Sequence, residues 1–417
     1  MSHDAYAALR RPAFRRYLLG HVLAVLGQGM LAVAVGWELY ERTGSTAVLG
    51  LVGLVQVIPL VALVLPAGHV VDSRDRRLVL IAAELVIGAA ALGLAAASLA
   101  RAPIPVYYGL LALYGVGRTF QLPAKQAILP GLVPLPVFTN AVAWNSGGWQ
   151  AAEVIGPALG GALIALAGTA AAAYLACGLA GLVFALLLTR IAVLSRPAGN
   201  RRLSWRALLE GIRFVRDSRV LLAAMSLDLF AVLLGGVMAL LPVFAKDYLD
   251  VGPTGLGWLR AAQSLGAVTT SMALAHGPPL RRAGPKLLAS VVGFGAAIVV
   301  FGLSRSFLLS VVALFLAGAF DGVSVVIRLA LAQIKTPDEL RGRVSAVNTL
   351  FIGMSNELGE FESGMAAALV GPVLAVVGGG VAVILVVAAV TRRWPEMARL
   401  DRLEDLAEGG WEDPAPG

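Results

Sequence analysis

Charged residues are scarce in this chain. Only 14% of its 417 residues are Asp, Glu, Lys or Arg, whereas a typical soluble domain carries about 25%. A soluble chain of this length would form two or three domains, and each would need a polar surface. The scarcity of charge therefore excludes a soluble enzyme, a nucleic-acid-binding domain and a disordered protein.

Residues that build covalent or metal-dependent sites are also few. The single cysteine, Cys177, lies in an apolar run, which excludes an intramolecular disulfide framework and a thiol–metal cluster. None of the four histidines belongs to a set of Cys, His and Asp residues at ligand spacing, so we assign no metal. No glycine-rich phosphate loop ending in Lys-Ser or Lys-Thr occurs, which argues against an ATP-driven pump. We expect no bound cofactor, and we expect no nucleic-acid partner because the basic residues lie in short loops.

Long apolar runs dominate instead. Hydrophobic residues make up 58% of the chain, and the mean hydropathy is +0.82. A helix that spans a bilayer needs about 20 mostly apolar residues. We predict an all-α integral membrane protein with twelve spans, at about 17–40, 46–71, 78–100, 104–126, 138–166, 169–190, 220–245, 254–276, 286–304, 307–334, 344–368 and 371–391.

The positions of lysine and arginine support an even number of spans. Of the 33 basic residues, 26 fall in the termini and loops on one side of the predicted membrane and four on the other. Basic residues concentrate in cytoplasmic loops. Both termini are therefore predicted to be cytoplasmic, in a multi-pass protein of the cell membrane.

A polar interval divides the predicted spans into two sets of six. We predict an N-terminal bundle at 1–194, a cytoplasmic linker at 195–219, and a C-terminal bundle with an acidic tail at 220–417. Within the linker, Ser204 can cap a short helix that lies at the membrane interface. One face of this helix would carry Trp205, Leu208, Leu209, Ile212 and Val215, with the arginines elsewhere.

The two halves resemble each other weakly. Residues 134–145 (PLPVFTNAVAWN) align with residues 337–348 (PDELRGRVSAVN) at an offset of 203, with Pro, Ala and Asn in register. Residues 75–80 have a fainter counterpart in residues 284–289. Repeated bundles of this kind place a substrate site between the halves, near the middle of the membrane.

Ionisable residues inside the spans are the strongest functional signal. Such a group costs about 2.5–3.5 kcal/mol at the centre of the bilayer, so it normally faces a partner or a water-filled cavity. The predicted fourth, fifth, tenth and eleventh spans carry most of these groups, and Asp228 in the seventh is a weaker candidate. The proton or substrate cavity is predicted to use Arg118, Glu153, Asp228, Asp321, Arg328, Glu357 and Glu360.

Two interpretations of these charges remain open. In the first, Arg118–Glu153 and Arg328 with Asp321 or Glu357 are ion pairs that only fix helix packing. In the second, the acids outnumber their basic partners, and the surplus exchanges protons, because a carboxylate in a low-dielectric medium favours its neutral form. Helical spacing places Asp321 with Arg328, and Glu357 with Glu360, on shared faces.

Residues 68–77 (GHVVDSRDRR) lie where the second predicted span meets the cytoplasm. A glycine four residues before an aspartate, followed by arginines, resembles the signature loop of the major facilitator superfamily. Asp75 at the usual glycine position resembles the branch of the enterobactin exporters and transmembrane secretion effectors. Similar stretches are residues 36–45 (GWELYERTGS), 123–130 (PAKQAILP), 156–161 (GPALGG) and 341–344 (RGRV).

This resemblance implies a twelve-helix transporter that works by alternating access. Carried over, the gating motif would be Gly68, Asp72, Arg74, Arg76 and Arg77. Gly156, Pro157, Gly160 and Gly161 would form the helix-packing motif of the superfamily's antiporters.

We therefore expect a monomeric, proton-driven exporter of small amphipathic organic compounds, such as drugs or siderophore-like molecules, and not an enzyme. The alternatives are a lysophospholipid flippase on the same scaffold, or a membrane receptor or assembly partner that transports nothing. The lack of a large extramembrane domain between the predicted spans argues against the last alternative.

Overall fold

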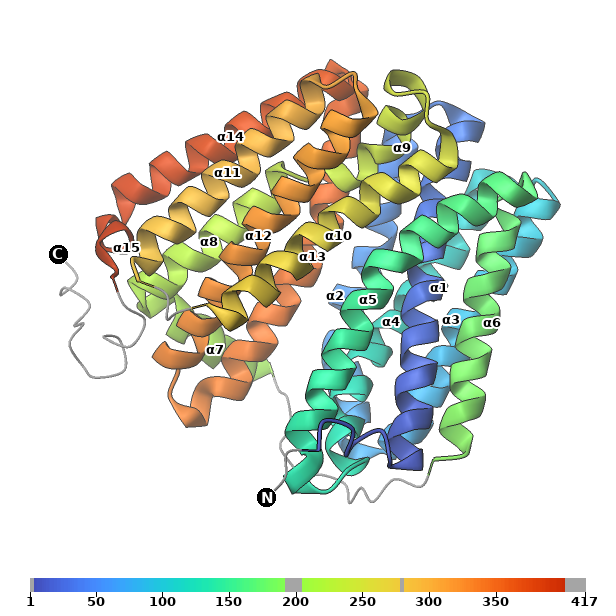
Figure 1. Ribbon diagram of the computed structural model, residues 1–417, viewed down its shortest axis with the longest axis horizontal. Coiled ribbons are helices and arrows are strands. Elements are labelled where there is room, and N and C mark those ends of the chain that lie inside the picture. Colours follow the sequence, from blue (N-terminus) through green and yellow to red (C-terminus); the bar gives the residue numbers. More distant parts are fainter. Residues whose placement is uncertain (1–3, 192–204, 278–280, 402–417) are drawn as a thin grey trace. The chain divides into compact units, whose positions relative to one another are not determined.

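The computed structural model describes residues 4–191, 205–277 and 281–401 (Figure 1). Within these ranges the chain forms helices and short connections and no β-strand, so the predicted all-α class is confirmed. The proposed cap residue Ser204 and most of the acidic tail lie outside the described residues.

The first half of the chain forms six long helices. They are α1 (Pro12–Thr43), α2 (Thr46–Ser73), α3 (Arg76–Leu99), α4 (Ile104–Ile128), α5 (Leu135–Ala167) and α6 (Ala171–Thr189), with a 3₁₀ turn at Leu129–Gly131. The contacts among them place α1 against α5 and α6, and α3 against α4 and α6.

The second half begins with the short helix α7 (Trp205–Asp217). It continues with α8 (Arg219–Leu234), α9 (Leu241–Val243), α10 (Gly252–His276), α11 (Ala283–Leu303), α12 (Phe307–Lys335), α13 (Asp338–Val370), α14 (Pro372–Arg393) and α15 (Pro395–Arg399). A 3₁₀ turn at Val237–Leu240 precedes α9, and a π-helical turn at Phe244–Tyr248 follows it. Helix α11 packs on α12 and α14, and α13 packs on α7, α8 and α14.

Local sequence signals explain where the helices begin and end. Pro12 begins α1, where a missing N–H costs nothing, and Gly44 ends it with φ +60°. Gly168 ends α5 with φ +67°, a conformation that glycine adopts without steric cost. The short breaks predicted near residues 168–169 and 370–372 are confirmed.

Nine helical segments in the described part of the chain are long and apolar enough to cross a membrane. Helices α4, α10 and α13 occupy the other three predicted spans but are less apolar. Helices α4 and α13 carry several of the ionisable residues that we assign to the site, including Arg118, Glu357 and Glu360. The predicted total of twelve spans stays a prediction.

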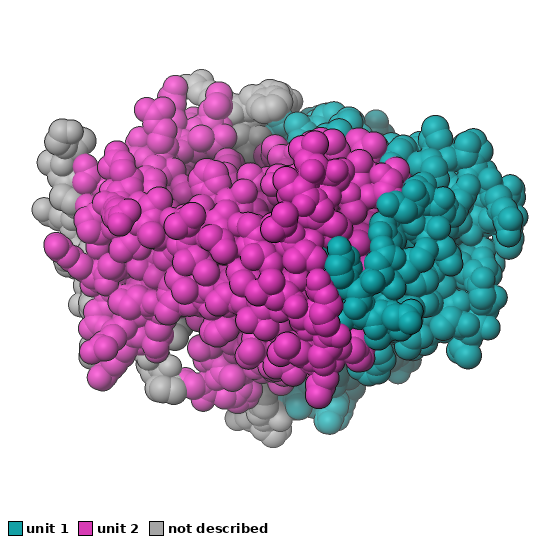
Figure 2. All heavy atoms as spheres, turned by 90° about the horizontal axis from the view of Figure 1, so that it is seen from above, with its two compact units in different colours: residues 1–44, 54–202, 244–261 teal, residues 45–53, 203–243, 262–417 magenta. Residues whose placement is uncertain are grey.

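The helices are grouped into two compact units, coloured separately in Figure 2. The first unit contains residues 1–44, 54–202 and 244–261, and the second contains residues 45–53, 203–243 and 262–417. Helices α2 and α10 each contribute residues to both units. The predicted domain boundaries at 194 and 219 stay a prediction.

The predicted linker helix is present as α7. Val215 is buried, and Gly211 lies against the backbone of Arg343 on α13. Leu209, Ile212 and Arg213 are exposed. The contact of an apolar face of this helix with the membrane stays a prediction.

Candidate transport site

A cavity of about 100 Å³ lies inside the second unit. Residues of α8, α10, α11, α12 and α13 line it, and Asp228, Asp321, Ser324 and Asn356 are among its polar groups. Gly235 and Gly236, where α8 ends, are part of its wall. This break in the helix therefore borders the cavity.

A charged pair lies beside the cavity. The Arg328 guanidinium forms an ion pair with the Asp228 carboxylate, and its Nε donates to Ser324 Oγ at 3.2 Å. Only 9% of the Arg328 side chain and 11% of the Asp228 side chain are exposed. The ion-paired partner is therefore Asp228, the residue ranked as the weaker candidate, and not Asp321.

Asp321 adds a second acid to this cluster. It lies on the same face of α12 as Ser324 and Arg328, as the spacing predicted, and it lines the cavity. It makes no hydrogen bond or ion pair of its own to any described residue, although the charges of Arg328 and Asp228 act on it. One basic residue thus faces two acids.

Close packing of α12 on α10 holds this face in place. A Cβ at Gly318 would lie 1.9 Å from the carbonyl oxygen of Gln263, and one at Gly322 would lie 2.9 Å from that of Ala267. Only glycine allows two helices to approach so closely. The carboxyl group of Asp321 is therefore carried on a helix with little freedom to shift.

Glu357 and Glu360 lie elsewhere in the second unit. They occur on α13 where that helix passes the beginning of α2, so that a Cβ at Gly53 would meet the Glu357 carbonyl oxygen and the Glu360 Cβ. The residue of α13 that lines the cavity is their neighbour Asn356.

The first unit contains its own group of charges. Glu153 on α5 is influenced by three cations, Arg118, Lys125 and Arg260, and its side chain hydrogen-bonds Trp149. Arg118 also donates to Gln56 Oε1 at 3.3 Å. The predicted proximity of Arg118 and Glu153 agrees with this arrangement, but the sequence analysis did not include the other two cations.

Glu84 on α3 is a deeply buried acid that the sequence did not single out. It is 0% exposed; its Oε1 accepts from Gln121 Nε2 at 2.7 Å and lies 3.9 Å from Lys125 Nζ. Only 11% of the Lys125 side chain is exposed, so its charge is compensated inside the bundle by Glu84.

One signal in the sequence could have revealed this cluster. Applied to α4, the repeat offset of 203 residues pairs Arg118 with Asp321, Gln121 with Ser324, and Lys125 with Arg328. The same offset pairs Glu153 with Asn356. Each unit therefore carries polar residues at the same positions of related helices. The charge differs at two of these positions: Arg118 corresponds to the acid Asp321, and the acid Glu153 corresponds to Asn356.

The proposed gating motif lies around the connection from α2 to α3. Asp75 caps α3 by accepting from the Arg77 backbone N–H at 2.9 Å. Arg76 Nη1 donates to the Ala127 carbonyl at 3.0 Å, and Arg77 Nη2 donates to the Thr189 carbonyl at 2.6 Å. Both arginines thus bind the last carbonyl groups of neighbouring helices, where positive charge is favourable.

The remaining members of the motif differ in exposure. Gly68 is buried, Asp72 is half-buried next to Arg76, and Arg74 is exposed. The structure therefore brings Asp72, Arg76 and Arg77 together near the ends of α4 and α6, and leaves Arg74 at the surface.

The predicted helix-packing motif on α5 is in close contact with two helices. Gly156 and Gly160 lie against α1, and Pro157 lies opposite Gly29 of α1. A Cβ at Gly161 would lie only 2.2 Å from the Pro253 carbonyl oxygen on α10. These small residues allow the backbones of α1, α5 and the first part of α10 to touch.

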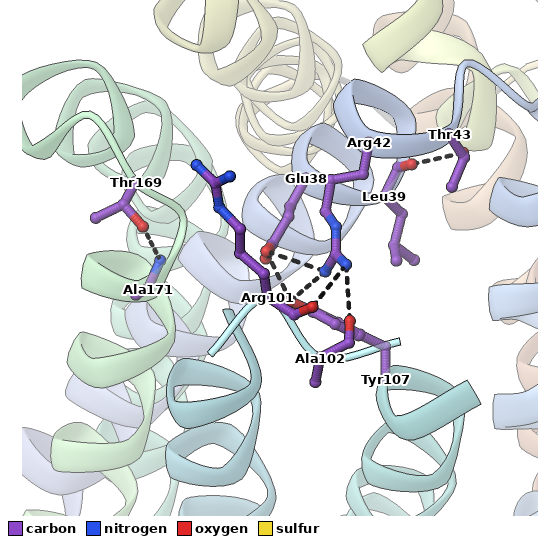
Figure 3. A network of polar contacts seen from close by, with 9 residues as sticks. All are labelled: Glu38, Leu39, Arg42, Thr43, Arg101, Ala102, Tyr107, Thr169 and Ala171. Carbon is purple, nitrogen blue, oxygen red and sulfur yellow. Dashed lines mark hydrogen bonds and ion pairs between the residues drawn. The ribbon is translucent and has the colours of Figure 1, made fainter. Parts of the chain in front are cut away.

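The segment 36–45 ends α1 in a polar network (Figure 3). Tyr107 Oη donates to Glu38 Oε1 at 2.7 Å and accepts from Arg42 Nη1 at 2.8 Å. Arg42 Nη2 also donates to the carbonyl of Ala102 at 2.7 Å. This network ties the end of α1 to the connection between α3 and α4, which gives the segment a structural role.

A helical membrane protein with charged groups clustered inside its bundles, and a cavity beside one cluster, has the features of a transporter. The transmembrane secretion effector family matches residues 3–414. The chain belongs to this family, a branch of the major facilitator superfamily, and the predicted transporter class is confirmed.

Curated relatives agree with this assignment. The enterobactin exporter EntS of Citrobacter koseri is 29% identical over 380 residues, which cover 90% of each chain. EntS of Shigella boydii serotype 4 is 29% identical over 381 residues, again with 90% of each chain covered.

Solved transporter structures share the fold. A bacterial homologue of the human lysosomal transporter Spinster superposes with a TM-score of 0.72 at 14% identity, covering 97% of this chain and 98% of that one. The nucleoside transporter NupG superposes with a TM-score of 0.68 at 14% identity, covering 92% and 99%. At such low identity the likeness concerns the fold alone.

Proposed function

We propose that this protein is a proton-coupled exporter of small amphipathic organic compounds, siderophore-like molecules or drugs among them, in the bacterial inner membrane. Its two six-helix bundles would comprise twelve spans with both termini in the cytoplasm, and it would act as a monomer by alternating access. The enterobactin exporters among its relatives support the direction and the substrate class.

The proton role rests on one observation. Asp321 lines the cavity beside Arg328, but that arginine is already paired with Asp228. Two acids that share one cation in a low-dielectric setting cannot both remain charged at little cost, so one of them takes up a proton readily. Asp228 and Asp321 both line the cavity, and Asp321 is the one that makes no hydrogen bond or ion pair with another described residue, which makes it the group that loads and releases the proton.

The other predicted residues have supporting roles in this proposal. Glu153 is the proton-exchanging acid of the first unit, with Arg118 beside it. Glu357 and Glu360 contribute acidic charge on α13. Gly68, Asp72, Arg76 and Arg77 form the cytoplasmic gate, with Arg74 at its edge.

Transport in proteoliposomes tests the proposal. Enterobactin, ethidium and a fluorescent lysophosphatidylcholine serve as probes, with and without an imposed pH gradient. We expect gradient-driven movement of a soluble probe by the unaltered protein. In Asp321→Asn we expect gradient-driven transport to fall at least tenfold. Exchange of the probe across the membrane without a gradient should be retained. Asp217→Asn, an exposed acid on α7, is the control.

Three results would contradict the proposal. Unchanged gradient-driven transport in Asp321→Asn, Glu153→Gln and Glu357→Gln would exclude the proton role. Movement of the lysophospholipid alone would identify a flippase. If no probe moved under any gradient, although partner proteins bound, the transporting role itself would be lost.

A further inference from the structure

Glu84, Gln121 and Lys125 form a buried polar cluster that the proposed mechanism does not yet use. Gln121 is 5% exposed, and Glu84 is completely buried. Lys125 Nζ is 3.9 Å from Glu84 Oε1 and 5.9 Å from the centre of the Phe184 ring. Lys125 thus lies near a carboxylate and an aromatic ring, and Gln121 Nε2 donates to the same carboxylate oxygen at 2.7 Å.

Lys125 also acts on a second acid. Its charge is one of the three that influence Glu153, and Glu153 in turn influences Lys125. Lys125 is therefore shared between Glu84, enclosed between helices, and Glu153, which the proposed function treats as a proton-exchanging group. The repeat supports this role, because Lys125 occupies the position of Arg328, the cation that two acids share in the second unit.

The acid that pairs with the shared cation lies on a different helix in each unit. In the second unit Asp228 lies on α8 and borders the cavity. In the first unit Glu84 lies on α3, and its second oxygen is buried without a hydrogen-bond partner among the described residues. The Glu84 carboxylate therefore contacts Gln121 and Lys125, and it acts on Glu153 through Lys125.

We propose that Glu84 is a positioning residue that keeps Lys125 compensated, so that Glu153 can be protonated and deprotonated during transport. A buried cation that loses its partner is strongly destabilised. With Glu84 in place, Glu153 can lose its charge without leaving Lys125 uncompensated. This inference rests on the proposed proton role of Glu153.

Within the described part of the chain, the other ionisable groups that act on the cluster come from four helices. They are Tyr17 and His21 on α1, Arg118 on α4, Cys177 on α6 and Arg260 on the first part of α10. Of these, only Arg118 and Arg260 carry a permanent charge, and both are positive. Glu84 is thus the acid, besides Glu153, that balances the local positive charge.

The test follows protonated carboxyl groups by infrared absorption during a pH titration of the full-length protein in lipid nanodiscs. The Glu153 signal is the part that disappears in Glu153→Gln. In Glu84→Gln, protonation of Glu153 would leave Lys125 uncompensated. We therefore expect the midpoint of this signal to move to lower pH by on the order of one unit. Lys125→Met removes a cation from Glu153 and should move the midpoint the other way.

Two further variants separate positioning from simple destabilisation. Glu84→Asp should keep a midpoint near that of the unaltered protein. In the double variant Glu84→Gln with Lys125→Met, the midpoint of the Glu153 signal should return toward that of the unaltered protein, because no uncompensated cation remains. Thermal melting of each variant confirms that it is folded at the temperature of the titration.

An unchanged midpoint in Glu84→Gln would overturn the positioning role. So would a shift to higher pH, which would mean that Lys125 had released its own proton. If Glu153 gave no titrating signal in the unaltered protein, both the positioning role and its proposed proton exchange would fail. If Glu153→Gln abolished gradient-driven transport while Glu84→Gln left the midpoint unchanged, only the role of Glu84 would be lost.

Discussion

Arg328 and Asp228 illustrate how single residues determine the properties of the second unit. Their ion pair is almost completely removed from solvent. Removal of one member of a buried pair leaves an uncompensated charge, whereas removal of both can cost little. The pair therefore couples two helices, α8 and α12, through a contact that a single substitution can break.

A double-substitution cycle measures this coupling. Arg328→Met should destabilise the protein by about 3–5 kcal/mol, since Asp228 stays buried without its partner. The double variant Asp228→Asn with Arg328→Met should recover much of that loss. Thermal melting in detergent reports the change, with Arg213→Gln on the exposed face of α7 as the control. Equal losses in the single and double variants would show that the pair does not couple the two helices.

At the scale of the helix, glycines decide which elements can touch. Helix α5 places Gly156 and Gly160 against α1, and Gly161 against the start of α10. Glycine is unfavourable in the interior of a helix, so its repeated use here is explained by backbone packing. The missing side chains of Gly318 and Gly322 likewise allow α12 to pack closely on α10.

Two alanine substitutions on α5 test this role. In Gly161→Ala the new Cβ would lie 2.2 Å from the Pro253 carbonyl oxygen, so the helices must separate. We expect a loss of about 1–3 kcal/mol in stability, the usual cost of overpacking. Gly147→Ala on the same helix has no atom within 4 Å and is the matched control. A melting temperature equally unchanged in both variants would show that close packing at Gly161 is not needed.

For the whole molecule, the distribution of basic residues predicts how the chain crosses the membrane. The connection between α2 and α3 carries the arginines of the gating motif, and the one between α11 and α12 carries Arg305 alone. The first should therefore be cytoplasmic and the second external. Exposed serines at Ser73 and Ser306 lie at these two places.

Cysteine labelling of intact cells tests the orientation. In a Cys177→Ala background, a membrane-impermeant maleimide should label Ser306→Cys directly. Ser73→Cys should react only after the membrane is opened. The reverse pattern would invert the proposed topology, and labelling of both in intact cells would contradict the predicted number of crossings.

Local signals in the sequence accounted for the helices, their ends and the family. Apolar length, a proline such as Pro12 at the start of a helix, and glycines such as Gly44 and Gly168 at the ends act over a few residues. Helical periodicity also predicted that Asp321 and Arg328 lie on the same face of one helix. These features need no knowledge of the neighbouring helices.

Only the tertiary structure decided which charges meet. Arg328 pairs with Asp228 from a helix about a hundred residues away in sequence, and Glu84 meets Lys125 across α3 and α4. Periodicity specifies the face on which a side chain lies, but helix packing specifies what that face touches. The charged residues in apolar segments therefore indicated a buried site. Their ion-pair partners depended on how the helices pack, which the glycine contacts between helices determine.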